Sequence, residues 1–293
     1  MKLSDELYEI GKNSKKICTY IDENYVILTK TMPINDAHLD EYINSIRKSK
    51  DNGINISSIL DYRLIEGTTS SYNNAVSYTK GVFLEERAKG KCISQFNITY
   101  LNLNENYDFN KIINDYLNQN ETYLSELEER SNANQEIYDK LVNDCLKLND
   151  FKLTIDPKPL NFFFDKDKGY NIIDVIPSDD NEITNEFFPK YIFNIVYGYA
   201  RPSIIVNSSS IYSLPSEMHN RYKECMDKLN AKIVKALRNN NINEEFIKKS
   251  LLENSKRIVF DNNDMNQDEI CIHLKEIFNQ EKQEKDDEIY LKW

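Results

Sequence analysis

A short β-hairpin interrupts the helical second half of the chain, and it constrains the fold more than any other feature. The three phenylalanines of residues 162–164 are typical of a strand, and residues 170–173 fit the return strand. Residues 165–169 between them are turn formers, and Gly169 stands where a positive φ is expected. The sequence therefore predicts two antiparallel strands joined by a tight turn.

Polar side chains stand at the open end of this hairpin. Antiparallel pairing brings the start of one strand beside the end of the other, so we expect Asn161 and Asp174 to lie close together. Their oxygens suit Mg²⁺, which keeps water and substrate phosphate as its other ligands. Asp156 can accept a proton from a hydroxyl, and Lys158 can neutralise charge on phosphoryl oxygens. This edge is therefore a candidate site for phosphoryl transfer.

The pattern Asp156-x-Lys158-Pro159-x-Asn161, with Asp174 on the next strand, resembles the catalytic loop and metal-binding aspartate of protein kinases. The resemblance implies that Asp156 is the catalytic base and that Lys158 stabilises the γ-phosphate. It also implies that Asn161 and Asp174 bind the metal. ATP and Mg²⁺ (or Mn²⁺) are the cofactors it implies.

The N-terminal third carries a second part of the resemblance. The apolar strand Val26–Lys30 resembles the kinase strand that ends in the lysine contacting the ATP phosphates. Its partner acid should come from the next helix, where Glu41 is the first candidate. Glu41 lies opposite the apolar stripe of that helix, however, whereas Asp36 and Asp40 lie nearer the edge of the stripe.

Two further segments complete the expected nucleotide site. Residues 82–90 resemble the last strand of the kinase N-lobe and the hinge, which implies that the backbone of Glu85 and Arg87 meets the adenine. The glycine-rich phosphate loop is reduced to a segment that begins at Gly11 and ends at Ser14.

The chain also departs from the kinase pattern. Thr154 and Ile155 replace the usual His-Arg before Asp156, so control by activation-loop phosphorylation is not expected. Val175 and Ile176 replace the Phe-Gly after the metal aspartate, and Ala-Pro-Glu is missing. The resemblance covers residues 8–176 and is specific only over 156–174.

The order of the predicted elements implies an α+β, two-lobed, protein-kinase-like fold. A small β-rich N-lobe would span residues 1–88, and a larger, mainly helical C-lobe would span 89–293. The helix patterns cover residues 36–48, 132–148 and 216–237, and the strand patterns of the first third cover 17–20, 25–29, 54–60 and 81–84. Asn132 and Gln135 resemble a capping box.

The function implied is that of an ATP- and Mg²⁺-dependent phosphotransferase, an atypical bacterial or viral protein kinase acting on Ser, Thr or Tyr hydroxyls. A small-molecule kinase of the aminoglycoside or choline type is an alternative, because those enzymes share the Asp…Asn…Asp set. Lys158 favours a protein acceptor. The sequence also fits, less well, a pseudokinase that serves as a binding module, or a nuclease that uses Asp156-Pro157-Lys158.

Composition narrows the partners and the compartment. The net charge of the 293 residues is −11, which argues against nucleic acid or an anionic membrane as the main partner. Five cysteines without a C-x-x-C pair indicate buried free thiols in a reducing compartment. With no signal-like N-terminus or apolar span, we expect a cytoplasmic protein, with leaderless export left open.

Overall fold

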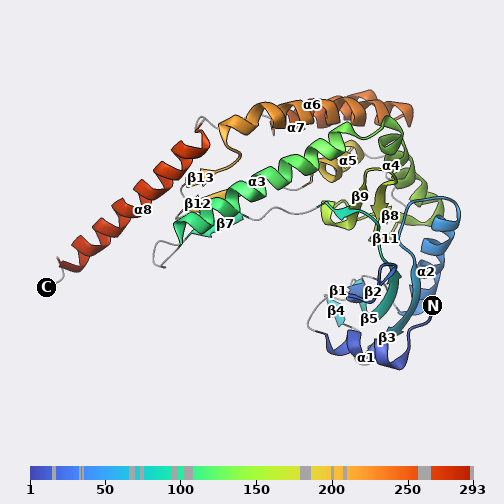
Figure 1. Ribbon diagram of the computed structural model, residues 1–293. Helices are drawn as coiled ribbons and strands as arrows, with labels where there is room; N and C mark the ends of the chain where they lie inside the picture. Colours follow the sequence, from blue (N-terminus) through green and yellow to red (C-terminus); the bar gives the residue numbers. More distant parts are fainter. Residues whose placement is uncertain are drawn as a thin grey trace.

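A computed structural model of the protein contains both helices and small sheets. It describes residues 1–14, 18–32, 34, 36–65, 70–72, 76–93, 98–101, 108–178, 186–198, 201–206, 210–256 and 265–290. An N-terminal sheet with two helices lies at one side of the molecule, and helices fill most of the remainder (Figure 1). The C-terminal end of the described chain lies far from this sheet (Figure 1).

The N-terminal sheet is antiparallel and has five strands. Four of them lie in the order β1-β2-β5-β3, and β4 pairs with a further part of β5. The strands are β1 (Cys18–Tyr20), β2 (Tyr25–Met32), β3 (Ile59–Leu64), β4 (Ser70–Tyr72) and β5 (Val76–Glu86). The strand predicted at residues 54–60 begins only at Ile59, because the residues before it connect the sheet to the helical part.

The two faces of this sheet pack against different helices. Val82 and Leu84 of β5 point to the face covered by α1 (Asp5–Asn13), which the sequence analysis missed. Phe83, between them, packs in the cluster that includes the apolar stripe of α2 (Asp36–Asp51). That stripe was predicted correctly, and it consists of Leu39, Tyr42, Ile43 and Ile46.

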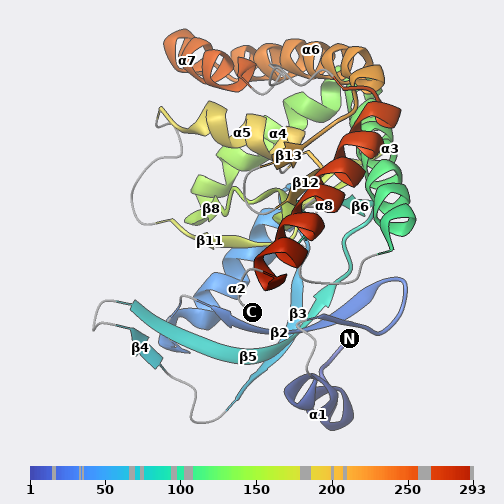
Figure 2. The ribbon, with the colours of Figure 1, turned by 90° about the vertical axis from the view of Figure 1, so that its left-hand side faces the viewer.

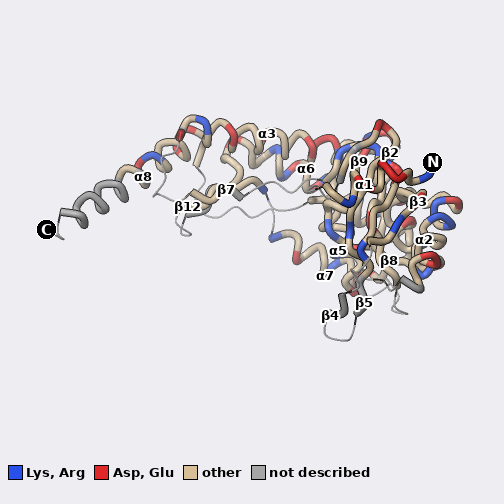
Figure 3. The backbone as a smooth tube through the Cα atoms, turned by 90° about the horizontal axis from the view of Figure 1, so that it is seen from below, with Lys and Arg blue, Asp and Glu red and all other residues tan. Residues whose placement is uncertain are grey.

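The helical part is built around a bundle. It contains α3 (Phe109–Asn132), α4 (Gln135–Lys147), α5 (Phe188–Tyr197), α6 (Ser216–Asn239) and α7 (Glu244–Ser255). Acidic residues outnumber basic ones along α3, and both kinds are scattered over the body of the molecule (Figure 3). The predicted helix at 132–148 is really the end of α3 followed by α4. Asn134, which makes no side-chain capping bond, stands at the N-cap of α4, so the expected capping box is wrong.

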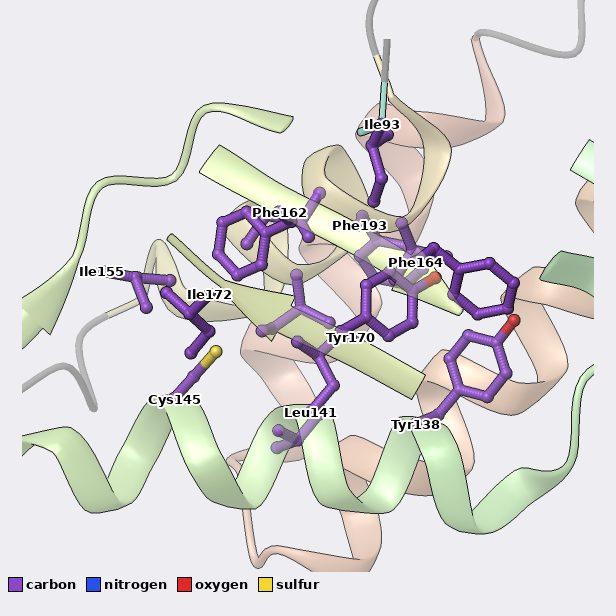
Figure 4. Close-up of a cluster of buried hydrophobic side chains, with 14 of the residues drawn as sticks. Ile93, Tyr138, Leu141, Cys145, Ile155, Phe162, Phe164, Tyr170, Ile172 and Phe193 are labelled. Atoms are coloured by element: carbon purple, nitrogen blue, oxygen red, sulfur yellow. The ribbon is translucent and has the colours of Figure 1, made fainter. Parts of the chain in front are cut away.

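The predicted hairpin is present and is joined by a third strand. β9 (Phe162–Asp165) pairs with β10 (Gly169–Ile172), and Gly169 has the expected positive φ of 80°. β6 (Lys91–Cys92) adds to β9. Phe162 and Tyr170 of the hairpin pack against α4, where Leu141 and Cys145 meet them (Figure 4). This core holds the hairpin firmly against the bundle.

Short strands flank the hairpin. β8 (Leu153–Ile155) comes before it and pairs antiparallel with β11 (Val175–Pro177), which comes after it. In Figure 2 the β8–β11 ladder lies between the N-terminal sheet at one end and α6 with α7 at the other. The residues that follow β8 and precede β11 therefore lie between the N-terminal sheet and the helical part.

A further three-stranded sheet, which the sequence did not predict, lies far from the N-terminal sheet (Figure 1). β7 (Ile98–Leu101) is parallel to β12 (Ser203–Val206), which pairs antiparallel with β13 (Ser210–Tyr212). One face buries Leu101, Ile204 and Val206 in a separate cluster with α3 and α8 (Gln267–Tyr290).

The N-terminal sheet and the helical part are joined by polar contacts of Asn55, which follows the end of α2. The backbone N–H of Asn55 donates to Asp144 Oδ2 over 2.9 Å, and Asn55 Nδ2 donates to the carbonyl of Tyr170 over 2.6 Å. Lys140 Nζ contacts the same carboxylate at 2.8 Å. Asp144 is only 3% exposed, so this carboxylate fixes the connection between the two parts.

We expect Asp144→Ala to lower the free energy of unfolding by about 2–3 kcal/mol, because it leaves a buried N–H without a charged acceptor. Lys140→Ala should have a smaller effect, since the Lys140 side chain is 45% exposed and its ion pair is partly screened. Urea unfolding followed by circular dichroism measures both. Equal effects of the two substitutions would contradict the assignment of Asp144 as the joining residue.

Candidate functional site

The segment after β8 forms a tight turn that fixes Asp156 relative to Asn161. The N–H of Lys158 donates to the carbonyl of Asp156 over 2.8 Å, and the N–H of Asn161 donates to the carbonyl of Lys158 over 2.9 Å. Pro159 begins a single 3₁₀ turn, which suits its fixed φ. Asn161 is 5% exposed, and its Nδ2 donates to the Asp156 carbonyl over 3.3 Å. That bond leaves the amide oxygen of Asn161 for another partner.

Strand register places Asp174 beside this turn. Val175 of β11 pairs with Ile155 of β8, so Asp174 and Asp156 are the next residues out on the two antiparallel strands. The N–H of Ile173 donates to the Asn161 carbonyl over 2.9 Å. The predicted proximity of Asn161 and the segment that carries Asp174 is therefore confirmed, with a second ladder supporting the one expected from the hairpin.

Lys158 and Asp156 form an ion pair. Lys158 Nζ lies 2.7 Å from Asp156 Oδ2. The Asp156 side chain is 18% exposed and that of Lys158 is 61% exposed. The lysine head group can therefore leave the carboxylate at little cost, because exposed ion pairs contribute about 0–1 kcal/mol.

Lys30 of β2 approaches the same place from the N-terminal sheet. Its Nζ lies 2.7 Å from Glu85 Oε1 and 5.5 Å from the centre of the Phe83 ring. β2 continues to Met32, so Lys30 is inside the strand rather than at its end. Most of the lysine is buried, which distinguishes it from a solvent-facing strand lysine.

Electrostatic effects link these groups into one site. Burial alone would lower the pKa of Lys30, but Glu85 and Asp174 together raise it. Burial raises the pKa of Asp174; Lys30 opposes this rise, Asp156 adds to it, and Lys158 opposes it. Burial also raises the pKa of Glu85 against the effect of Lys30. Lys30, from the N-terminal sheet, and Asp174, from the helical part, thus act on each other directly.

The expected pairing of Lys30 with Glu41 is wrong. Glu41 is 65% exposed and contacts Lys152, with 3.4 Å between the charged atoms. The buried stripe of α2 turns Glu41 away from the site, as its helical position indicated. The residue of α2 that does reach the site is Tyr42, whose hydroxyl donates to the Val175 carbonyl over 2.6 Å.

The expected phosphate loop at Gly11–Ser14 is also wrong. Gly11 lies in the last turn of α1, and Ser14 is its C-cap. The C-terminal end of a helix presents carbonyl oxygens and negative potential, which disfavour a phosphate. Gly11 serves packing instead, because a Cβ there would lie 2.5 Å from a methyl group of Val82.

The predicted hinge contacts fall partly within the sheet. Glu85 pairs with both Val26 and Ile59, and the N–H of Arg87 donates to the Asn24 carbonyl over 2.7 Å. The backbone N–H of Arg87 therefore already donates to another residue of the chain and is not free to meet adenine, as the hinge prediction required. Gly90, three residues on, has a φ of 93°, and a Cβ there would lie 2.2 Å from the Phe164 carbonyl oxygen.

Two surface pockets of the described part lie next to this site and not in it. Their volumes are about 230 and 530 Å³, and they share Glu41, Ser45 and Lys152 on the exposed side of α2. Tyr42 lines the smaller pocket, and its hydroxyl donates to the carbonyl of Val175, the residue after Asp174. Neither Asp156 nor Asp174 lines either of these two pockets.

Among the described residues, no three His, Cys, Asp or Glu side chains converge as a metal site. The predicted metal pair of Asn161 and Asp174 offers only two protein ligands, the arrangement Mg²⁺ adopts when phosphates and water complete its shell. Cys92, Cys145, Cys225 and Cys271 are free thiols. Cys145 and Cys225 are buried as expected, and Cys92 and Cys271 are half-buried.

Comparison with known proteins adds no relative. Neither a family model, nor a curated protein, nor a solved structure matches this chain. None of the helices in the described ranges has the length and apolar character needed to span a bilayer.

The raised pKa of Asp174 predicts that its charged carboxylate destabilises the folded chain at neutral pH. A carboxyl whose folded pKa is raised opposes folding once the pH exceeds its unfolded pKa of about 3.9, and the penalty disappears below that value. We therefore expect Asp174→Asn to raise the melting temperature at pH 7 in EDTA. Near pH 3.5 the substitution should have little effect, because at roughly that pH the Asp174 carboxyl is largely protonated in both the folded and the unfolded chain. Scanning calorimetry measures this. A lower melting temperature at pH 7 would contradict it.

Proposed function

We propose that this chain is an ATP- and Mg²⁺-dependent phosphotransferase with a two-lobed, protein-kinase-like arrangement. The N-terminal sheet with α1 and α2 would form the small lobe, and the helical part the large one. Four of the residues singled out from the sequence, Lys30, Asp156, Asn161 and Asp174, lie in or beside one group of interacting side chains.

One observation carries this proposal. Lys30 and Asp174 lie far apart in the sequence and on different parts of the molecule, yet each changes the pKa of the other. The kinase resemblance assigns Lys30 to the ATP phosphates and Asp174 to the metal that accompanies them. A hairpin with an accidental polar edge gives no reason for a buried lysine of another sheet to lie within electrostatic range of Asp174.

The residues present fit a divalent cation. Asn161 Nδ2 is used by the Asp156 carbonyl, which leaves its oxygen as a ligand. Burial is the main reason why the pKa of Asp174 is raised, and the neighbouring Asp156 adds to the rise. A bound Mg²⁺ would stabilise the charged carboxylate and would neutralise phosphate oxygens. Asn161 and Asp174 are the residues that would hold it.

The remaining residues account for the transfer chemistry. Asp156 would orient the acceptor hydroxyl and take its proton as the oxygen attacks the γ-phosphorus, while the bond from that phosphorus to the β–γ bridging oxygen breaks and ADP leaves. Lys158, which is mostly exposed, would shift from the Asp156 carboxylate to the phosphoryl oxygens as negative charge develops there. Lys30 would contact the phosphates from the N-terminal sheet.

A hydroxyl on a protein is the acceptor we favour. Lys158 stands two residues after the base, as it does in protein kinases, and its contact with Asp156 puts it beside the incoming hydroxyl. A small-molecule acceptor would leave Asp156 and Asp174 with the same roles, so the nucleotide chemistry does not depend on this choice.

We expect ATP to bind tightly only when Mg²⁺ is present, because three acids, Glu85, Asp156 and Asp174, face two lysines and repel phosphate unless a cation intervenes. Calorimetric titration of ATP in Mg²⁺ and in EDTA measures this. Asp174→Ala should abolish the dependence of ATP affinity on Mg²⁺. The control Asp150→Ala, which removes an acid outside the site, should retain that dependence. Equal affinity in EDTA and in Mg²⁺ would contradict the metal pair.

A further inference from the structure

The ion pair between Lys30 and Glu85 lies within one sheet. Lys30 is opposite Gly81 and Glu85 is opposite Val26, so the two residues lie four positions apart along the ladder, roughly 13 Å. They share a face with Phe83, which lies between them. The lysine runs flat along the sheet and over the Phe83 ring to place its Nζ 2.7 Å from Glu85.

Glu85 is a costly residue to bury. It is 2% exposed, and a buried carboxylate is tolerated only when a cation and hydrogen bonds offset its desolvation. Leucine or phenylalanine at this position would pack against the same neighbours without that cost. The carboxylate therefore serves Lys30 rather than the stability of β5.

The first-choice acid on the helix next to the sheet does not reach this lysine. Glu41 is turned to the surface and contacts Lys152, and Tyr42 is the residue of α2 that reaches toward Asp174. If an acid of α2 held Lys30, the position of the Lys30 ammonium would change whenever that helix moved. Because Glu85 holds it, the position of the ammonium depends only on two hydrogen-bonded strands, β2 and β5.

We propose that Glu85 is the positioning residue for Lys30, and that it holds the phosphate-binding ammonium in place whatever the position of α2. This inference rests on the proposed function, because it assigns the residue that orients Lys30 toward the nucleotide. It implies a site that is active without a movement of α2, which agrees with the absence of the usual arginine before Asp156.

The test compares Glu85→Gln with Glu41→Gln in the full chain, using MgATP titration and steady-state phosphotransfer. Misplacing a catalytic group by about 1 Å can lower turnover by roughly 10²-fold, so Glu85→Gln should lower kcat/KM for ATP by about that factor. Glu41→Gln should leave kcat/KM within about twofold. The melting temperature of Glu85→Gln should fall, because the substitution leaves the buried Lys30 charge without its paired carboxylate, so activity is compared at a temperature where both chains are folded.

A double-mutant cycle separates positioning from a general structural role. In a Lys30→Ala background, Glu85→Gln should change kcat/KM by less than about twofold, since the lysine it positions is gone. An equal loss in both backgrounds would overturn the inference, and so would a large effect of Glu41→Gln with none of Glu85→Gln. Failure of the native protein to bind MgATP would instead refute the proposed function, before any variant is compared.

Discussion

Replacing Asp156 with asparagine should lower kcat by about 10²–10⁴-fold, the usual contribution of a general base. Asparagine keeps the size of the side chain and one acceptor oxygen, but it loses the charge and the basicity. MgATP affinity should change little, because Asp156 faces the acceptor rather than the nucleotide. Single-turnover transfer and calorimetric binding measure the two quantities.

Two controls give this variant its meaning. Asp174→Asn should weaken metal-dependent binding and turnover together, so the contrast with Asp156→Asn tests the roles and not merely the importance of the site. Lys158→Ala removes the same 2.7 Å ion pair but keeps the base, so its turnover shows what the proposed phosphate-binding lysine contributes by itself. Transfer by Asp156→Asn at the native rate would mean that Asp156 is not the base.

Phe162→Ala should lower the free energy of unfolding by about 3–5 kcal/mol. Phe162 is fully buried in the core cluster that also holds Leu141 and Cys145 of α4 (Figure 4), and the strand it begins follows Asn161 directly. Removing the ring leaves a cavity in the core that holds the site residues in place. Urea unfolding monitored by circular dichroism measures the loss.

The matched control is Leu252→Ala in α7, where the side chain is 70% exposed. Its effect should lie within about 0.5 kcal/mol of zero, as expected for surface positions. A similar midpoint and slope for Phe162→Ala and the native chain would contradict the packing described for the hairpin.

The local part of the site was predictable from the sequence. Asp156, Lys158, Asn161 and Asp174 lie within one hairpin and its flanks, where turn chemistry and strand period fix which residues meet. Gly169 carried the signal for the turn. No pairing over a long distance was needed to bring these four residues together.

The N-terminal contacts were harder to predict, because they depend on packing rather than on local pattern. Gly11 looked like part of a phosphate loop, but its lack of a side chain allows α1 to approach Val82. Glu85 was expected to act through its backbone, whereas its side chain pairs with Lys30. One signal could have found it: on β5, Glu85 alternates with Leu84 and therefore shares the face of Phe83.

The sheet of β7, β12 and β13 could not have been predicted from local pattern. Its strands have three or four residues, and β7 pairs in parallel with a strand about a hundred residues later in the chain. Short strands give weak periodicity, and parallel pairing leaves no turn signal between the partners. The electrostatic interaction between Lys30 and Asp174, in contrast, joins two residues that the kinase resemblance had already assigned to the nucleotide site.

The most direct measurement of the central claim is transfer of the labelled γ-phosphate of ATP in Mg²⁺. The purified chain is incubated alone and with a mixture of protein acceptors, beside Asp156→Asn and Asp174→Ala. We expect Mg²⁺-dependent labelling of protein hydroxyls by the native chain, and its loss in both variants. Labelling that persists in EDTA, or that is equal in the native chain and the variants, would contradict the assignment of this site to phosphoryl transfer.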